Sequence, residues 1–140
     1  MIKQRTNQQT ASRNVTWRIF YDEGCQFHRT AKGAVSRPEI FTPEIIQNIA
    51  AMAVEKFIMA VLLERRLTPL GHTMTDLCQA AASIMPLTPR LWKTLMYMDN
   101  LQQICSIEHF QITAPSLEDV PAFLEAADAV ADAARKILFP

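Results

Sequence analysis

Four side chains that could bind an anion or a polar partner lie close together in the sequence: Lys56, Arg65, Arg66 and His72. Lys56 falls in an otherwise apolar arc of a helical pattern. An ammonium group there must reach water along its methylene stem or meet a carbonyl or carboxylate acceptor. The first alternative is a lysine that reaches water at a helix crossing, and the second is a lysine that bonds an acceptor near the turn that follows. Because the two arginines and the histidine flank that turn, the sequence predicts a ligand-binding region here.

Each of these residues also has a purely structural interpretation. Arg65 and Arg66 fall in the last turn of a predicted helix, where the helix dipole alone favours cations. Thr73 and Asp76 have the spacing of a capping box for the next helix, and His72 could simply support that helix start. The sequence therefore leaves two interpretations of Arg65, Arg66 and His72: a binding region, or a helix end followed by a helix start.

Other titratable residues give weaker indications of chemistry. His28 lies at the edge of a predicted buried stripe, where a hydrogen-bonded packing role is expected. Glu108 and His109 are adjacent in a predicted loop, but neighbouring side chains diverge in most backbone conformations. No Glu is followed three residues later by His, and no Gly-rich phosphate loop, nucleophile elbow or metalloprotease motif occurs. We predict neither a metal site nor a cofactor.

The composition indicates a helical protein. Only 3 of the 140 residues are Gly, whereas Ala, Leu and Met are plentiful. The 14 basic residues are balanced by 14 acidic ones, and the segment after Gly71 is apolar, so we expect no DNA partner. The 3 cysteines stand at no metal-ligand spacing, which favours a reducing, cytoplasmic location.

The patterning predicts a single domain. Residues 1–12 are polar and lack the apolar centre of a signal peptide, so we expect a flexible N-terminal arm there. A single helical-bundle domain is predicted over 13–140. No unbroken apolar run approaches the roughly 18 residues of a membrane span, so no membrane partner is expected.

Helical periodicity recurs in five segments. They are 14–35, 43 to about 66, 74–85, a segment from 89 onward, and a last helix that begins after Ser116 or Asp119. Short connections favour antiparallel neighbours, so the predicted fold is all-α, an up-and-down antiparallel bundle of about five helices. Gly24 lies in the buried stripe of the first segment, where the missing Cβ would allow a neighbouring helix to approach closely.

The segment from 43 to about 66 is the predicted spine of the bundle. Apolar side chains cover most of its circumference, so more than one neighbour must pack on it. Even its more polar strip contains Ala51, Ile58 and Leu62. We interpret this strip as a surface for a protein partner, most economically a second copy of the chain, and expect a homodimer.

The stretch AMAVEKFIMAVLLERRLTPLGHTMTDL, residues 51–77, resembles the core signature of the HEPN family (higher eukaryotes and prokaryotes nucleotide-binding domain). In that family a helix with Ala-x-x-Glu-Lys-x-x-x-Ala-x-Leu leads through a short loop to His-x-x-x-x-Leu. The matching positions are Ala53, Glu55, Lys56, Ala60, Leu62, His72, Asp76 and Leu77.

The resemblance implies a HEPN-like, usually dimeric helical bundle whose members bind nucleotides, partner a nucleotidyltransferase in toxin–antitoxin pairs, or cleave RNA. The RNA-cleaving members carry an Arg shortly before a His on a later helix, whereas no Arg precedes His109 at that spacing here. We therefore expect a noncatalytic dimeric module that binds a nucleotide or a nucleotidyltransferase-like protein. The alternative is a metal-independent, toxin-like ribonuclease with Arg66 and His72, which have five residues between them, as its catalytic pair.

Overall fold

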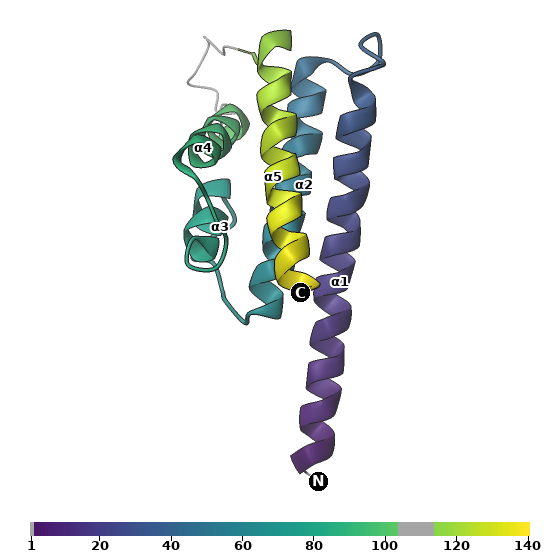
Figure 1. The fold of residues 1–140 in the computed structure, drawn as a ribbon, viewed down its shortest axis with the longest axis vertical. Helices are drawn as coiled ribbons and strands as arrows, with labels where there is room; N and C mark the ends of the chain where they lie inside the picture. Colours follow the sequence, from purple (N-terminus) through teal and green to yellow (C-terminus); the bar gives the residue numbers. More distant parts are fainter. Residues whose placement is uncertain (1, 104–113) are drawn as a thin grey trace.

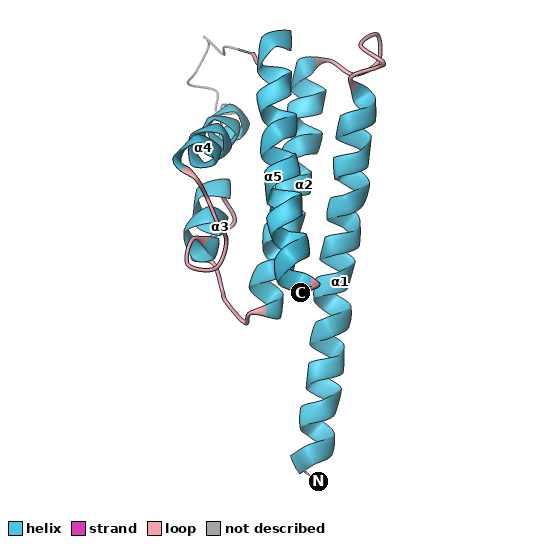
Figure 2. Ribbon diagram, in the orientation of Figure 1, coloured by secondary structure: helices cyan, strands magenta, loops and turns pink. Residues whose placement is uncertain are grey.

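A computed structural model of the chain describes residues 2–103 and 114–140, with the side chains of 16–101 and 114–140. Within these ranges the elements are α1 (Ile2–Ala34), α2 (Pro43–Glu64), α3 (Met74–Ala81), α4 (Pro89–Gln103), the short 3-10 helix η1 (Leu117–Asp119) and α5 (Val120–Leu138) (Figure 1). The described part of the chain contains no strand, and loops join the helices (Figure 2). The prediction of an all-helical protein with five α-helices is confirmed.

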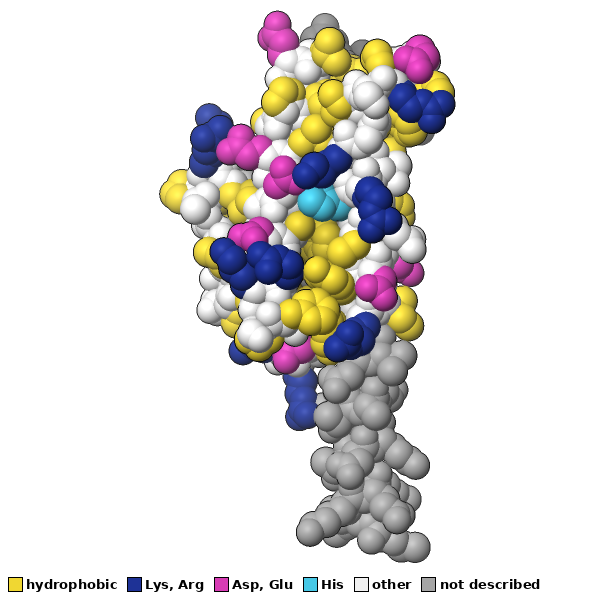
Figure 3. All heavy atoms as spheres, turned by 45° about the vertical axis from the view of Figure 1, so that its right-hand side comes forward, with side chains coloured by type: hydrophobic (Ala, Val, Ile, Leu, Met, Phe, Trp, Pro, Cys, Tyr) yellow, Lys and Arg dark blue, Asp and Glu magenta, His cyan; other side chains and the backbone are white. Residues whose placement is uncertain are grey.

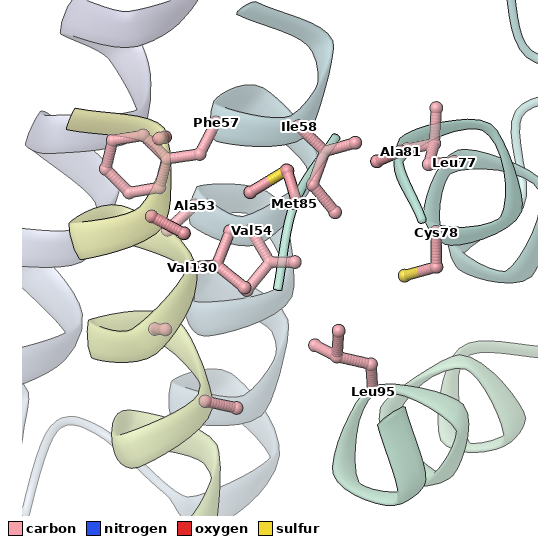
Figure 4. Packing of buried hydrophobic residues seen from close by; sticks show 14 of the residues in the cluster. Ala53, Val54, Phe57, Ile58, Leu77, Cys78, Ala81, Met85, Leu95 and Val130 are labelled. Atoms are coloured by element: carbon pink, nitrogen blue, oxygen red, sulfur yellow. The ribbon is translucent and has the colours of Figure 1, made fainter. Parts of the chain in front are cut away.

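The second helix, α2, is the centre of the bundle, and it contacts α1, α3, α4 and α5. Phe57 points toward α1 and α5, whereas Ile58 points toward Leu77 of α3 (Figure 4). Ala51, Ile58 and Leu62 are all 0% exposed. The prediction that this strip of α2 faces a second copy of the chain is therefore wrong, because helices of the same chain cover it.

The helices do not form a simple up-and-down bundle. Trp17 of α1 contacts Phe139, the C-cap of α5, and His28 of α1 contacts Asp128 of α5, so these two helices are antiparallel. A short loop makes α1 and α2 antiparallel as well, and α2 and α5 consequently run in the same direction (Figure 1). The prediction of antiparallel neighbours is wrong for this pair. The reason is that α3 and α4 carry the chain back along one side of the bundle before α5 begins.

Helix starts follow the local signals in the sequence. Thr42 is the N-cap of α2 and accepts a hydrogen bond from the Ile45 N–H, with Pro43 at the first helical position. Thr73 and Asp76 form the predicted capping box of α3. These caps fix where α2 and α3 begin, and hence where the turn between the two helices lies.

Two other boundaries differ from the predicted ones. Helix α1 begins at Ile2, so residues 2–12 of the predicted arm form its first turns and extend beyond the rest of the bundle (Figure 1). The flexibility of the arm stays a prediction. Helix α3 ends at Ala81 instead of residue 85. Pro86 contributes to this early end, because a proline disfavours helical conformation in the residue before it.

Helices α1 and α2 approach closely at Gly24. A Cβ on Gly24 would lie 2.9 Å from two ring carbons of Phe57. The prediction that the missing Cβ allows a neighbouring helix to approach closely is therefore confirmed. Tyr21 and His28 pack on the same phenyl ring, with ring centroids 5.6 and 6.0 Å from that of Phe57. Phe57 thereby positions Tyr21 and His28 beside α5.

By length and composition α2 could cross a membrane, and it is the one such helix among the residues searched. The charged pair Glu55 and Lys56 interrupts its apolar sequence. Of its most apolar 18-residue window, 61% is buried inside the bundle, which is the behaviour of a core helix in a folded domain.

Candidate ligand-binding site

Lys56 lies midway along α2, and its side chain is 28% exposed. Its Nζ is 2.7 Å from Oε2 of Glu23 and 4.9 Å from the ring centroid of Phe20, both on α1. The Lys56 ammonium group therefore has a carboxylate acceptor, as a cation in an apolar arc of a helix requires. The alternative in which this acceptor lies near the following turn is wrong, because the neighbouring helix supplies it.

Arg65 and Arg66 form the end of α2. Arg65 is the C-cap, and its Nε lies 2.8 Å from the carboxylate of the adjacent Glu64. Arg66 has a φ of 58°, in the left-handed region, and the Leu67 N–H donates to the Leu62 carbonyl at 2.9 Å. These features define a Schellman motif, in which the left-handed position is normally a glycine. Both arginines thus have a structural place at the helix end.

His72 is exposed and directly precedes Thr73, the N-cap of α3. Lys56 is about 14 Å along the helix axis from Arg65, at about 1.5 Å per residue. None of the four residues that the sequence singles out lines either of the two hollows described below. The structure therefore does not gather Lys56 with the turn, and ligand binding by Arg65, Arg66 and His72 stays a prediction.

A hollow of about 450 Å³ lies between α1 and α5, on the far side of α1 from Lys56. Helix α1 contributes Tyr21, Cys25, His28, Arg29 and Lys32. Helix α5 contributes Asp128, Ala131, Asp132 and Arg135, and Phe57 of α2 lies beneath them. In Figure 3, with α1 turned forward, Lys and Arg side chains flank a histidine above apolar surface.

His28 joins the two walls of this hollow. Its Nε2 lies 2.5 Å from Oδ1 of Asp128, and its ring meets the Phe57 ring edge-on. The side chain is only 19% exposed. The predicted role of a hydrogen-bonded packing histidine is confirmed. Lys32 approaches the same carboxylate oxygen at 3.5 Å, so two basic side chains bind Asp128.

The second carboxylate of the hollow is also bound by cations. Lys136 and Arg135 lie 3.0 and 2.8 Å from Asp132, and their hydrogen bonds hold the pKa of that carboxyl below its ordinary value. Arg29, in contrast, forms no ion pair with any side chain that the structure describes. Both carboxylates of the hollow therefore have basic partners, whereas the Arg29 guanidinium has no carboxylate partner among the described side chains.

Tyr21 supplies an aromatic hydroxyl to the same hollow. Burial, and then its hydrogen bond with Cys25, raise the pKa of Tyr21 above its ordinary value. The phenol stays protonated at neutral pH, and its oxygen can still accept a hydrogen bond while its proton is engaged with Cys25. Tyr21 also packs against Phe139 at a centroid distance of 5.1 Å, which ties the C-terminus to this end of the hollow.

A second hollow, of about 300 Å³, lies between α4 and α5. Alanine side chains and Leu91 form its largely apolar surface. An ion pair between Arg90 and Glu125, 3.0 Å apart, crosses its rim. Its two cations, Arg90 and Lys136, both have carboxylate partners, Glu125 and Asp132 respectively. Its chemistry suits an apolar group better than an anion.

Sequence reasoning missed the α1–α5 hollow because its walls are about a hundred residues apart in the chain. Within α1 a signal does exist: Tyr21, Cys25, His28 and Lys32 recur at steps of four, three and four along one helix face. Nothing local indicates that Asp128 lies opposite. Glu108 and His109, considered from the sequence, lie outside the described residues.

Among the residues searched, no group of three or more His, Cys, Asp or Glu side chains could hold a metal ion. No family model, no curated protein and no solved structure matches the chain.

Proposed function

We propose that this chain is a noncatalytic helical binding module that holds an anionic ligand of the nucleotide class in the α1–α5 hollow. The observation that carries the proposal is the free guanidinium of Arg29 beside Lys32 and Arg135. A phosphate group needs such donors, and arginine binds phosphate oxygens with a planar, two-pronged geometry. Arg29 would therefore be the first contact of the phosphate.

The size and lining of the hollow support a ligand of this class. About 450 Å³ falls within the usual range of roughly 300–1,000 Å³ for small-molecule sites. The Tyr21 ring and hydroxyl can contact a base or sugar, while the cations contact phosphate. The resemblance of residues 51–77 to the HEPN signature points to the same ligand class, and it also implies a nucleotidyltransferase-like protein as a partner.

The charge pattern favours binding over catalysis. His28 and Lys32 bind Asp128, and Arg135 and Lys136 bind Asp132. The hydrogen bonds from Lys136 and Arg135 lower the pKa of Asp132 and make it a weak base, so this carboxylate is not suited to accept a proton from a substrate. The cations that remain exposed at the hollow can attract an anion without changing it.

Isothermal titration calorimetry with ADP, GTP and inorganic phosphate tests the proposal. We expect the nucleotides to bind the wild-type chain and Arg29→Gln to weaken them at least about tenfold, which is about 1.4 kcal/mol. Arg37→Gln is the matched control. It removes the same charge from the exposed loop after α1, so the affinity should be retained.

A second pair of substitutions distinguishes ligand binding in this hollow from ligand binding at the turn after α2. The double variant Arg65→Gln, Arg66→Gln should leave nucleotide affinity unchanged. If this variant abolishes binding while Arg29→Gln binds normally, the ligand sits at the turn. If no nucleotide binds the wild-type chain, the proposed ligand class is wrong.

A further inference from the structure

The hollow between α4 and α5 has a largely apolar surface. Its volume of about 300 Å³ is at the lower end of the usual range of roughly 300–1,000 Å³ for small-molecule sites. Four alanines of α5 line it at steps of four, three and four: Ala122, Ala126, Ala129 and Ala133. These steps keep the alanines on one face of the helix. Because an alanine side chain ends at its Cβ, this face leaves room beside the helix for a ligand.

The direction of α4 keeps it from filling this room. Helix α4 runs at a steep angle to α5 instead of along it, and it lines the hollow with Arg90, Leu91 and Thr94 of its first turns (Figure 1). Leu91 and Ala126 are buried, whereas Ala129 is exposed. The hollow therefore has an apolar floor and a side that is open to solvent.

The charged residues of this hollow balance one another. Arg90 lies 3.0 Å from Glu125, and Lys136 lies 3.0 Å from Asp132. Two cations and two carboxylates thus line the hollow, and their formal charges sum to zero. A charged ligand of either sign would meet a like charge beside each opposite one, and it would lose hydration on the apolar surface. The hollow therefore favours an uncharged ligand.

Thr94 supplies a polar contact at the edge of the apolar floor. Its side chain is half-buried, and its hydroxyl donates to the Arg90 carbonyl at 3.3 Å. A threonine hydroxyl that donates one hydrogen bond can still accept another on its oxygen. An N–H or O–H group of a ligand can therefore bind to Thr94 while the rest of the ligand covers the alanine face.

We propose that the α4–α5 hollow binds an uncharged, mainly apolar small molecule with one hydrogen-bond donor, of the class of indoles and phenols. The ring lies on the alanine face of α5 and against Leu91, and its N–H or O–H donates to Oγ1 of Thr94. Burial of apolar surface on both partners drives the binding. The two hollows share Asp132 of α5, but the cations proposed to bind a phosphate lie in the other one, so this site does not depend on the nucleotide proposal.

A titration of the full, isotopically labelled chain with indole, followed by NMR chemical-shift changes, tests this site. We expect a dissociation constant below about 1 mM, with the largest changes around Leu91, Thr94 and Ala129. Ala129→Leu places a larger side chain in the hollow and should weaken indole binding at least about tenfold. Ala82→Leu is the matched control, because it makes the same change at an exposed alanine outside the hollow. Circular dichroism checks that both variants keep their helices.

Two further ligands test the chemistry of the contact. N-methylindole lacks the donor, and Thr94→Val removes the acceptor with little change of shape. Thr94→Val should therefore weaken indole about threefold and leave the affinity for N-methylindole unchanged. An indole carboxylate, which is an anion, should bind more weakly than indole. Arg29→Gln lies in the other hollow and should leave the indole affinity unchanged.

Four results would overturn this proposal. The first is a wild-type chain that shows no binding at about 5 mM indole. The second is an Ala129→Leu variant that binds indole normally, or an Ala82→Leu variant that loses binding equally. The third is a Thr94→Val variant that weakens N-methylindole as much as indole. The fourth is an indole carboxylate that binds more tightly than indole, because the hollow would then select an anion.

Discussion

Nε2 of His28 lies 2.5 Å from Oδ1 of Asp128, one hundred residues further along the chain. This contact joins α1 to α5 across the hollow that we propose as the ligand site. It also engages the carboxylate that would otherwise repel a phosphate group. The pair is thus both a link between helices and part of the electrostatics of the hollow.

The stability contributed by this pair can be measured with a double-mutant cycle of His28→Gln and Asp128→Asn. Because Asp128 is 48% exposed, we expect a coupling of only about 0.5–1 kcal/mol. The measurement is urea unfolding followed by circular dichroism. Glu118→Gln, an exposed carboxylate on η1, serves as the control and should change the unfolding free energy by less than about 0.5 kcal/mol. Purely additive single effects would show that the contact contributes nothing.

Two glycines of α1 should respond in opposite directions to alanine. A Cβ on Gly24 meets the Phe57 ring at 2.9 Å, so Gly24→Ala should destabilise the fold by about 1–3 kcal/mol. A Cβ on Gly33 meets nothing within 4 Å, so Gly33→Ala should stabilise the helix by up to about 1 kcal/mol. Thermal unfolding of both variants compares them directly, and equal effects would contradict the close approach of α1 and α2.

Arg66 occupies a left-handed position that suits glycine. Arg66→Gly should therefore raise the unfolding free energy by about 0.5–1 kcal/mol. Arg65 is the control, because its φ of −88° gives glycine no steric advantage. Arg65→Gly should be neutral or destabilising by up to about 1 kcal/mol. Loss of stability in Arg66→Gly would mean that its side chain makes contacts that outweigh the backbone strain.

The alternative function, a ribonuclease that uses Arg66 and His72, makes a separate prediction. Under the binding-module proposal, any RNA cleavage by the purified chain comes from contamination. His72→Ala should therefore leave the cleavage rate unchanged in a gel assay with a labelled RNA. A His72→Ala variant that is folded and loses most of the cleavage would establish the ribonuclease instead.

The two cysteines that the structure describes, Cys25 and Cys78, should differ in reactivity. Burial, and then the nearby Asp99, raise the pKa of the Cys78 thiol to about 12, and its side chain is fully buried. Iodoacetamide reacts with the thiolate, so Cys78 should resist labelling in the folded chain at pH 8 while half-buried Cys25 is labelled. Peptide mass spectrometry reads both sites, and equal labelling would contradict the burial of Cys78.

The same thiol gives the stability a pH dependence. Its folded pKa of about 12 lies above the ordinary value of 9.0, so the unfolded chain loses this proton first as the pH rises. The contribution is complete below about pH 9 and falls between pH 9 and 12. Cys78→Ala should flatten the decline in unfolding free energy over that window. An unchanged slope would show that other groups cause the decline.

Local signals in the sequence predicted much of the fold. The N-caps Thr42 and Thr73 were predictable because each depends on neighbours within its own helix. The close helix approach at Gly24 was predictable because this glycine lies in the apolar stripe of its helix. The parallel direction of α2 and α5 was not predictable, because it depends on the path that α3 and α4 take between these two helices. Ala51, Ile58 and Leu62 show the same limit, since helical periodicity does not say which neighbour covers a face.

The site was less predictable than the fold. The sequence drew attention to Lys56, whose acceptor proved to be Glu23 on a different helix. His28 was correctly interpreted as a hydrogen-bonded packing residue, but nothing in the sequence marks Asp128 as its partner. A pair separated by a hundred residues becomes visible only when the packing of α1 against α5 is known.

The central claim is that an anionic, nucleotide-class ligand binds between α1 and α5. Its most direct test is a titration of the isotopically labelled chain with ADP, followed by NMR chemical-shift changes. We predict the largest changes around Arg29 and Lys32 on α1 and around Asp128 and Arg135 on α5. Changes confined to Arg65 and the turn after it, or no changes at all, would contradict the claim.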